Sequence, residues 1–270
     1  MWEGLSDMSQ KTFTPEYDLR HTDVFEGMVS IRSVLDGVCS GISKRKIRQV
    51  LFAESHIKGN GKLLGFLKAR SFVCGYTLET VPDEIIKKYT SGNSHGGIIM
   101  LAGKREYPEH FENVPEKGFY VLLDGIEDPY NLGYSIRSLY AAGADGILLP
   151  KHSPMSSAGI VCRSSAGASE LIPIVSCDTA EEALRLRSFG YRLVLSDMNA
   201  PAPAHLSDLT KPLILAVGGE KRGFGKRLTA LADLTVRLDY ARDFPMALSA
   251  ASASAILSFE VAKQNPKEFS

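Results

Sequence analysis

The sequence predicts an α/β fold whose larger, C-terminal part is a parallel sheet covered by helices on both faces. Two observations support this class. After residue 117, short and fully apolar runs such as Leu213 to Val217 alternate with helical segments. Strands buried on both faces need such runs, and parallel strands need helical crossovers. Before residue 104, short apolar and amphipathic stretches also alternate, which predicts a second, smaller α/β domain.

The chain divides into four predicted segments. Residues 1–20 lack periodicity and form an N-terminal extension, and residues 21–103 form the small domain. Residues 104–117 (KREYPEHFENVPEK) are charged, contain two prolines and show no apolar period, so they form a linker. Residues 118–270 form the large domain. We see no internal repeat and no low-complexity tract.

Each element follows from its local pattern. In the small domain we expect strands at Ile47–Phe52 and Gly97–Leu101 and helices at Lys62–Ala69 and Val81–Lys88. In the large domain we expect strands at Phe119–Leu123, Gly146–Leu149, Leu171–Val175, Tyr191–Leu195, Leu213–Val217 and Thr235–Leu238. The helices expected there are Asn131–Ala142, Ser157–Gly167, Thr179–Phe189, Lys226–Ala232 and a final Ala/Ser-rich helix, Ala247–Lys263. Ligands of such sheets bind at the carboxyl ends of the strands.

Composition excludes several classes of protein. The 270 residues are 44% hydrophobic and 23% charged, and no apolar run approaches the roughly 20 residues of a membrane helix. The residues from Met1 to Lys11 lack the basic and then apolar order of a secretory signal. The four cysteines are scattered, with no pair at C-x-x-C spacing, which argues against a zinc site or a disulfide framework. We therefore expect a cytoplasmic protein that binds neither a membrane nor a metal.

The charge of the chain is zero overall but unevenly placed. Between Lys44 and Arg70 there are eight basic residues and a single acidic one, Glu54. A solvated helix face would produce this pattern, and so would a surface that faces nucleic-acid phosphates. Charge alone leaves both interpretations open.

Three loops after predicted strands contain the unusual residues. In the first, DGIEDPYNLGYSIR, Asn131 can cap a helix, Gly133 allows another chain to approach, and Arg137 lies further along the helix. A purely structural role, in which Asn131 caps the helix and Arg137 forms a surface salt bridge, would explain this motif equally well. The second, AVGGEKRGFG, is glycine-rich around Glu220 but lacks the spacing of a phosphate-binding P-loop. The third, LDYARDFPMALSAASASAIL, leads through Pro245 into a helix of small residues, which suits close packing in a core or a dimer.

These three loops, in this order, resemble the signature motifs of the SpoU (TrmH-like) RNA 2′-O-ribose methyltransferases of the SPOUT superfamily. The first motif matches at Asn131, Gly133 and Arg137, the second at Gly218, Glu220 and Gly223, and the third at Leu238 and residues 248–255. Residues 119–263 carry the resemblance, and the small domain resembles the family's ribosomal-protein-like RNA-binding domain, ending in His-Gly-Gly-Ile from His95. Two residues depart from the pattern: Lys221 replaces a glycine, and Ser249 replaces an asparagine.

The resemblance implies a trefoil-knotted methyltransferase domain that binds S-adenosylmethionine, acts on RNA and forms a homodimer. It implies cofactor contacts at Ser196, Gly218, Gly219, Glu220, Leu238 and Leu248. It implies catalytic roles for Asn131, Arg137, Glu220 and Ser249, and RNA contacts at Lys44, Arg45, Lys46, Arg48 and Arg137. Since arginine is almost never deprotonated, Arg137 is expected to bind RNA phosphate and to stabilise the developing oxyanion rather than to act as a base. Serine has a shorter reach than asparagine, so Ser249 affects substrate positioning more than cofactor binding.

Alternatives stay open at this point. The chain could be an RNA-binding relative that has lost methyl transfer, as Ser249 suggests, or a SPOUT enzyme that methylates a base. A nucleotide-dependent metabolic enzyme would need a phosphate loop that the sequence does not contain. Ribosomal RNA is expected ahead of transfer RNA, and the nucleotide and a housekeeping or antibiotic-resistance role stay open.

Overall fold

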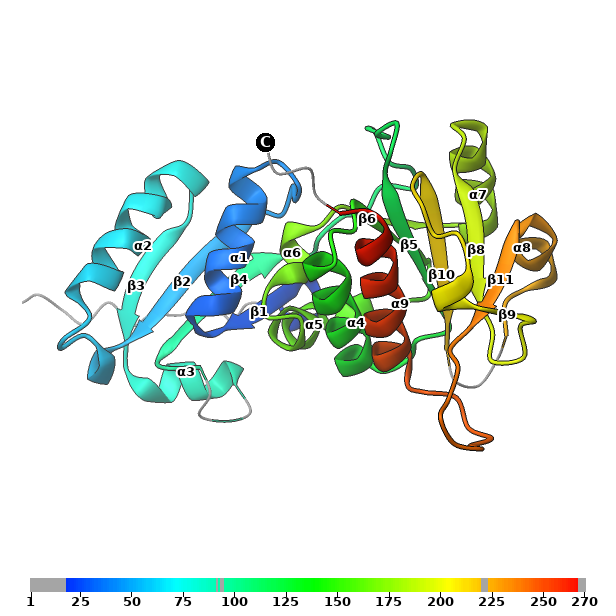
Figure 1. The fold of residues 1–270 in the computed structure, drawn as a ribbon. Helices are drawn as coiled ribbons and strands as arrows, with labels where there is room; N and C mark the ends of the chain where they lie inside the picture. Colours follow the sequence, from blue (N-terminus) through cyan, green and yellow to red (C-terminus); the bar gives the residue numbers. More distant parts are fainter. Residues whose placement is uncertain (1–17, 91, 93–94, 220–222, 267–270) are drawn as a thin grey trace, which may run out of the picture.

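The computed structural model describes residues 18–90, 92, 95–219 and 223–266, and these form two sheets (Figure 1). The N-terminal sheet has the order β1-β4-β2-β3, with β4 antiparallel to β1 and β2 and with β3 parallel to β2. Its elements are β1 (Thr22–Glu26), α1 (Gly27–Cys39), β2 (Ile47–Ala53), α2 (Gly61–Cys74), β3 (Thr77–Val81), α3 (Asp83–Tyr89) and β4 (Ile98–Gly103). Short 3₁₀ helices lie at Leu19–His21 and Glu54–His56.

Strand β2 is buried because helices cover both of its faces. Val50 and Phe52 pack in the cluster that contains Ile31 and Leu35 of α1, whereas Leu51 packs in the cluster of Ile86 from α3. Alternate residues of a strand point to opposite faces, so the continuous apolar run of β2 supplies both clusters. This explains why the strand was predictable.

The C-terminal sheet has the order β7-β6-β5-β10-β8-β11-β9, and all of its neighbouring strands are parallel. Its strands are β5 (Phe119–Asp124), β6 (Gly146–Pro150), β7 (Ile174–Cys177), β8 (Arg192–Ser196), β9 (Ala202–Pro203), β10 (Leu213–Gly218) and β11 (Leu234–Arg237). Its helices are α4 (Pro129–Ala141), α5 (Ala158–Ser164), α6 (Ala168–Leu171), α7 (Thr179–Ser188), α8 (Lys226–Leu231) and α9 (Ala250–Gln264), with 3₁₀ turns at Pro154–Ser157 and Ala204–Leu206. The α/β class with a parallel sheet is therefore confirmed.

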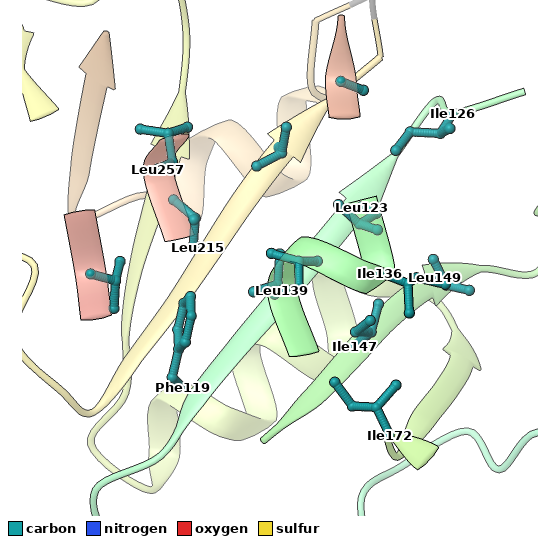
Figure 2. Packing of buried hydrophobic residues seen from close by; sticks show 14 of the residues in the cluster. Phe119, Leu123, Ile126, Ile136, Leu139, Ile147, Leu149, Ile172, Leu215 and Leu257 are labelled. Atoms are coloured by element: carbon teal, nitrogen blue, oxygen red, sulfur yellow. The ribbon is translucent and has the colours of Figure 1, made fainter. Parts of the chain in front are cut away.

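Helices lie on both faces of this sheet, and the side chains of β5 show the division. Phe119 and Leu123 pack with Ile136 of α4 and Leu257 of α9 (Figure 2). Tyr120 and Leu122 point to the other face, into the cluster formed with α7 and α8. Figure 1 shows α9 beside α4, so the last helix returns to the first helix of this part of the chain.

One predicted helix is broken. The expected helix over residues 157–167 ends at Ser164, because Ala166 and Gly167 both have positive φ, 51° and 89°. A Cβ at Gly167 would lie 1.8 Å from Ser33 Oγ of α1. The turn after α5 therefore packs so closely against α1 that only glycine fits at this position. The chain resumes as α6, and the strand predicted from Leu171 begins only at Ile174.

Other boundaries also shift for local reasons. The helix predicted from Val81 begins at Asp83, because Val81 ends β3 and Pro82 occupies the N-cap. β1, α1 and β3 were not predicted. Residues 104–117 contain no helix or strand, yet Arg105 and Phe111 in this segment are buried. The division at residues 103 and 118 stays a prediction, although each part contains its own sheet. No helix among the described residues has the length and apolar composition that crossing a membrane requires.

Candidate functional site

A cavity of about 340 Å³ lies where β8, β10 and β11 end, at the carboxyl edge of the parallel sheet. Five of the six predicted cofactor residues line it: Ser196, Gly218, Gly219, Leu238 and Leu248. The sixth, Glu220, lies outside the described residues. The structure thus brings together residues up to 52 positions apart in the sequence.

Glycine is required where two loops of this site touch. A Cβ on Gly219 would lie 2.1 Å from the carbonyl oxygen of Gly125, closer than real contacts allow. Gly125 itself has a φ of +69°, which favours glycine. The loop after β10 therefore packs backbone to backbone against the loop after β5, with no side chain between them.

The cavity also has lining residues that the sequence did not single out. Asp197 and Asn199 follow β8 directly, and the Asp197 carboxylate accepts a hydrogen bond from the Asn199 amide at 2.8 Å. Tyr240 also lines the cavity, and its hydroxyl accepts a hydrogen bond from the Leu248 backbone amide at 3.2 Å. Position after a strand could have indicated Asp197 and Asn199. No local pattern marked Tyr240, because its partner is set by how the later loop folds back.

Asn131 lies in a second cavity of about 130 Å³, next to the first. Gly219 lines both cavities, and Ala250 of α9 lines the second. Asn131 was predicted to cap α4, and this prediction is wrong, since the carboxylate of Asp128 accepts hydrogen bonds from the backbone amides of Tyr130 and Asn131. The Asn131 side chain has no hydrogen bond with any residue that the structure describes, so its amide is available to a ligand.

Arg137 is exposed on α4 and lines neither cavity. It forms no hydrogen bond or ion pair with the described part of the chain. A single chain therefore does not place Arg137 together with Asn131 and the glycine loops.

Ser249 acts as the N-cap of α9. Its hydroxyl oxygen accepts a hydrogen bond from the Ser252 amide at 3.2 Å and lies 3.0 Å from the Ser252 hydroxyl. Its neighbours Leu248 and Ala250 line the two cavities, but Ser249 does not. The structure shows a capping role, and the predicted catalytic role stays a prediction.

Four of the five basic residues predicted to contact RNA lie between Lys44 and Arg48, and they separate into two groups. Lys44 and Lys46 are exposed, and Arg48 is half-buried with a hydrogen bond from its guanidinium to Thr22 Oγ1 at 2.9 Å. Arg45 is fully buried, with ion pairs to Asp23 at 2.5 Å and to Glu170 at 3.1 Å. The prediction that Arg45 contacts RNA is therefore wrong, because its guanidinium is taken up by two buried carboxylates.

The charge state of Arg45 follows from these neighbours. Burial lowers the pKa of its guanidinium, but the carboxylates of Glu170 and Asp23 raise it more, so the net pKa is raised. Arg45 stays charged and links α6 of the large sheet's helical layer to the N-terminal sheet.

The remaining polar candidates are His95 and the four cysteines. His95 accepts a hydrogen bond from the Gly97 amide through Nδ1 at 3.0 Å, in the turn before β4. Cys39, Cys74, Cys162 and Cys177 are free thiols. Within the described ranges, no three His, Cys, Asp or Glu residues gather in a way that would hold a metal ion.

The chain is similar in sequence to known proteins over most of its length. The model of the SpoU rRNA methylase family matches residues 118–259. The chain is 30% identical over 232 residues to a protein of Bacillus subtilis assigned to the TrmH family of tRNA/rRNA methyltransferases, covering 83% of this chain and 91% of that protein. It is 29% identical over 177 residues to the 23S rRNA (guanosine-2′-O-)-methyltransferase of Pseudomonas putida, covering 63% of this chain and 71% of that protein.

A solved structure is similar over nearly the whole chain. The S-adenosylmethionine-bound rRNA methyltransferase of Sinorhizobium meliloti matches with a TM-score of 0.76 and 24% identity, covering 92% of this chain and 89% of that one. This likeness shows that the fold is shared.

Proposed function

This chain belongs to the SpoU rRNA methylase family, and we propose that it methylates a ribose 2′-oxygen of ribosomal RNA. It is an RNA methyltransferase, and its methyl donor is S-adenosylmethionine. The observation that carries the proposal is the pair of adjoining cavities at the carboxyl edge of the sheet. One is lined by the glycine loops and the other by Asn131, and they share Gly219.

The first cavity fits the methyl donor. Its volume of about 340 Å³ is within the range of small-molecule sites, and it combines apolar walls with a few polar groups. Leu238 and Leu248 would flank the adenine, while Asp197 and the backbone groups of Gly218 provide hydrogen-bonding partners. S-adenosylmethionine supplies an electrophilic methyl group on a sulfonium that leaves as a neutral thioether.

The protein's residues then have to align the attacking oxygen. We assign Asn131 to hold the ribose in the second cavity, beside the first. We assign Arg137 to an RNA phosphate and to the negative charge that develops on the 2′-oxygen as its proton passes to water, because a guanidinium binds phosphate in a bidentate manner and keeps its charge. Glu220 is assigned to position the arginine or its own loop, as the resemblance implies.

A homodimer would bring Arg137 to the site. The exposed face of α4 carries Tyr130, Tyr134 and Tyr140 around Arg137, and the adjacent face of α9 exposes Ile256 and Phe259. Several exposed aromatic and apolar side chains on two packed helices are typical of an interface between proteins. We infer that two copies pair through α4 and α9, so that Arg137 of one copy serves the cavities of the other.

The knotted path implied by the family belongs to the same proposal. The strand order places β10 between β5 and β8, and α9 then returns to pack on α4. This arrangement gathers the loops after β10 and β11 around one cavity. Support for an N-terminal role in RNA binding comes from the exposed Lys44 and Lys46.

Transfer of tritium from labelled S-adenosylmethionine into purified ribosomal and transfer RNA tests the proposal. We expect label in ribosomal RNA, retained in ribose after digestion, and lost in Arg137→Ala. Arg227→Ala, which removes an exposed arginine from α8, is the matched control and should keep activity. Label in the base, or only in transfer RNA, would refute the ribose or the ribosomal part respectively.

A complete absence of label, with cofactor binding intact, would favour the alternative of an RNA-binding relative without transfer. Ser249 is the feature that prompts this alternative. Ser249→Asn then becomes the decisive variant, because gain of activity would show that the serine alone limits the reaction.

The dimer has its own test, in which inactive variants are mixed. Arg137→Ala and Gly219→Ala each remove one contribution to the site. If sites form across two copies, randomly reassociated mixtures should recover about a quarter of wild-type activity, since half of the dimers are mixed and each then has one intact site. No recovery from a mixture that forms mixed dimers would contradict the shared site.

A further inference from the structure

A third cavity, of about 230 Å³, lies where β5 and β6 end. It shares Gly125, Ile126 and Glu127 with the Asn131 cavity, which in turn shares Gly219 with the cofactor cavity. The three cavities therefore form a row along the carboxyl edge of the sheet, with the Asn131 cavity in the middle. No predicted site residue lines the third cavity.

The lining of the third cavity combines apolar and polar side chains. Leu123, Leu132 and Leu149 supply apolar surface. Asp124, Glu127, His152 and Ser153 supply polar side chains. A planar heterocycle needs both, because its faces are apolar and its edge carries donors and acceptors.

Asp124 is the polar group that requires an explanation. It is the last residue of β5, and its backbone lies in register with Gly218 at the end of β10. Its side chain is half-buried, yet it forms no hydrogen bond or ion pair with any residue that the structure describes. An ionised carboxylate can only accept hydrogen bonds, so a ligand of this cavity has to donate them.

We propose that the third cavity receives the base of the target nucleotide and that Asp124 selects guanine. This inference rests on the proposed function. The Watson–Crick edge of guanine carries N1–H and the N2 amino group side by side, so both carboxylate oxygens of Asp124 accept hydrogen bonds at once. Adenine and cytosine place an acceptor nitrogen beside their amino group, and uracil places a carbonyl on each side of N3–H. In each case a lone pair faces a carboxylate oxygen.

The order of the cavities follows the covalent order of a nucleotide. With the base beside Asp124, the ribose enters the middle cavity beside Asn131, and its 2′-oxygen faces the cofactor cavity. Gly219 lines both the middle and the cofactor cavity, and it has no side chain that would stand between the 2′-oxygen and the methyl donor. Taking a base out of its stack to reach such a pocket is common among enzymes that modify nucleotides.

The first experiment identifies the labelled nucleoside. Ribosomal RNA labelled by the wild-type protein is digested to nucleosides and separated, and we expect 2′-O-methylguanosine. Asp124→Asn replaces one acceptor by a donor and should lower kcat/KM for RNA about ten- to a hundredfold, while the affinity for S-adenosylmethionine stays unchanged. Glu84→Gln, an exposed carboxylate variant on α3, is the control and should behave as wild type.

Label in any other nucleoside, or an Asp124→Asn variant with wild-type kcat/KM, would overturn the base assignment and leave the methyltransferase intact. If no RNA is labelled, the proposed function fails, and saturation-transfer NMR then tests the base site directly. The four nucleoside 5′-monophosphates serve as probes with the wild-type protein and Asp124→Asn. Preferential contact of guanosine monophosphate that disappears in the variant supports the site, and equal contact of all four overturns it.

Discussion

Replacing Arg45 by methionine should destabilise the protein strongly without removing an RNA contact. Methionine keeps apolar volume over the Phe25 ring, against which the guanidinium stacks with its carbon 4.8 Å from the ring centre. The change leaves the carboxylates of Asp23 and Glu170 buried, 4% and 0% exposed, without their shared partner. Removing one member of such a buried ion pair costs about 3–5 kcal/mol.

The structure places the cost near the lower end of this range, about 3 kcal/mol. Asp23 keeps an ion pair with Lys104 at 2.5 Å, and Glu170 keeps Arg105 at 3.9 Å. With an unfolding slope of about 3 kcal/mol per molar urea, the midpoint should fall by roughly 1 M. Far-UV circular dichroism in urea measures this shift. Lys46→Met, an exposed neighbour, should change the free energy of unfolding by less than about 0.5 kcal/mol.

A second substitution and an RNA-binding assay distinguish a structural role of Arg45 from an RNA contact. Adding Glu170→Gln to Arg45→Met should recover part of the lost stability, because it removes one of the two buried carboxylates that have lost their ion pair with Arg45. Filter binding at several salt concentrations then measures RNA affinity of the folded variants. A small loss of stability, together with weaker RNA binding and a flatter salt dependence, would refute the structural role and restore Arg45 to the RNA surface.

Three further predictions follow from the described contacts. Gly219→Ala should abolish binding of S-adenosylmethionine in calorimetry, because its Cβ would meet the Gly125 carbonyl, and wild-type affinity would disprove this packing. Lys44→Ala with Lys46→Ala should weaken RNA binding and lower its salt slope, with cofactor affinity unchanged; an unaltered slope would remove these lysines from the interface. The pKa of Glu182 is lowered in the folded protein, because hydrogen bonds from Arg185 and His110 outweigh the effect of its burial, so the stability it contributes is present above pH 4.5 and is lost as the pH falls through its folded pKa. Glu182→Gln should flatten this acid limb in urea titrations at several pH values, and an unchanged limb would contradict the assignment.

Most strands of the large sheet could be predicted from the sequence because their burial is local information. β5 and β10 lie between other strands and under helices on both faces, so every position from Phe119 to Leu123 is apolar. The meeting of the loops after β8, β10 and β11 around one cavity was also predictable, since loops that follow such strands lie at one edge of the sheet. The break at Gly167 was not, because the contact that imposes it comes from Ser33, which is 134 residues earlier in the chain.

Arg45 shows which features of its environment could be predicted from the sequence and which could not. Lys44, Arg45 and Lys46 directly precede β2, and their burial alternates as it does along a strand whose side chains point to two sides. Arg45 therefore falls on the same side as Ile47, a buried residue, while the lysines fall on the other. The alternation was readable and would have separated Arg45 from the RNA surface. Glu170 could not be predicted as its partner, because Glu170 lies 125 residues away and only the packing of α1 against α6 brings it near. For Arg137 the reverse holds: its motif was recognisable, but the chain alone leaves it exposed and outside both cavities. The role that we propose for it therefore requires a second copy, which no pattern in the sequence of one chain can place.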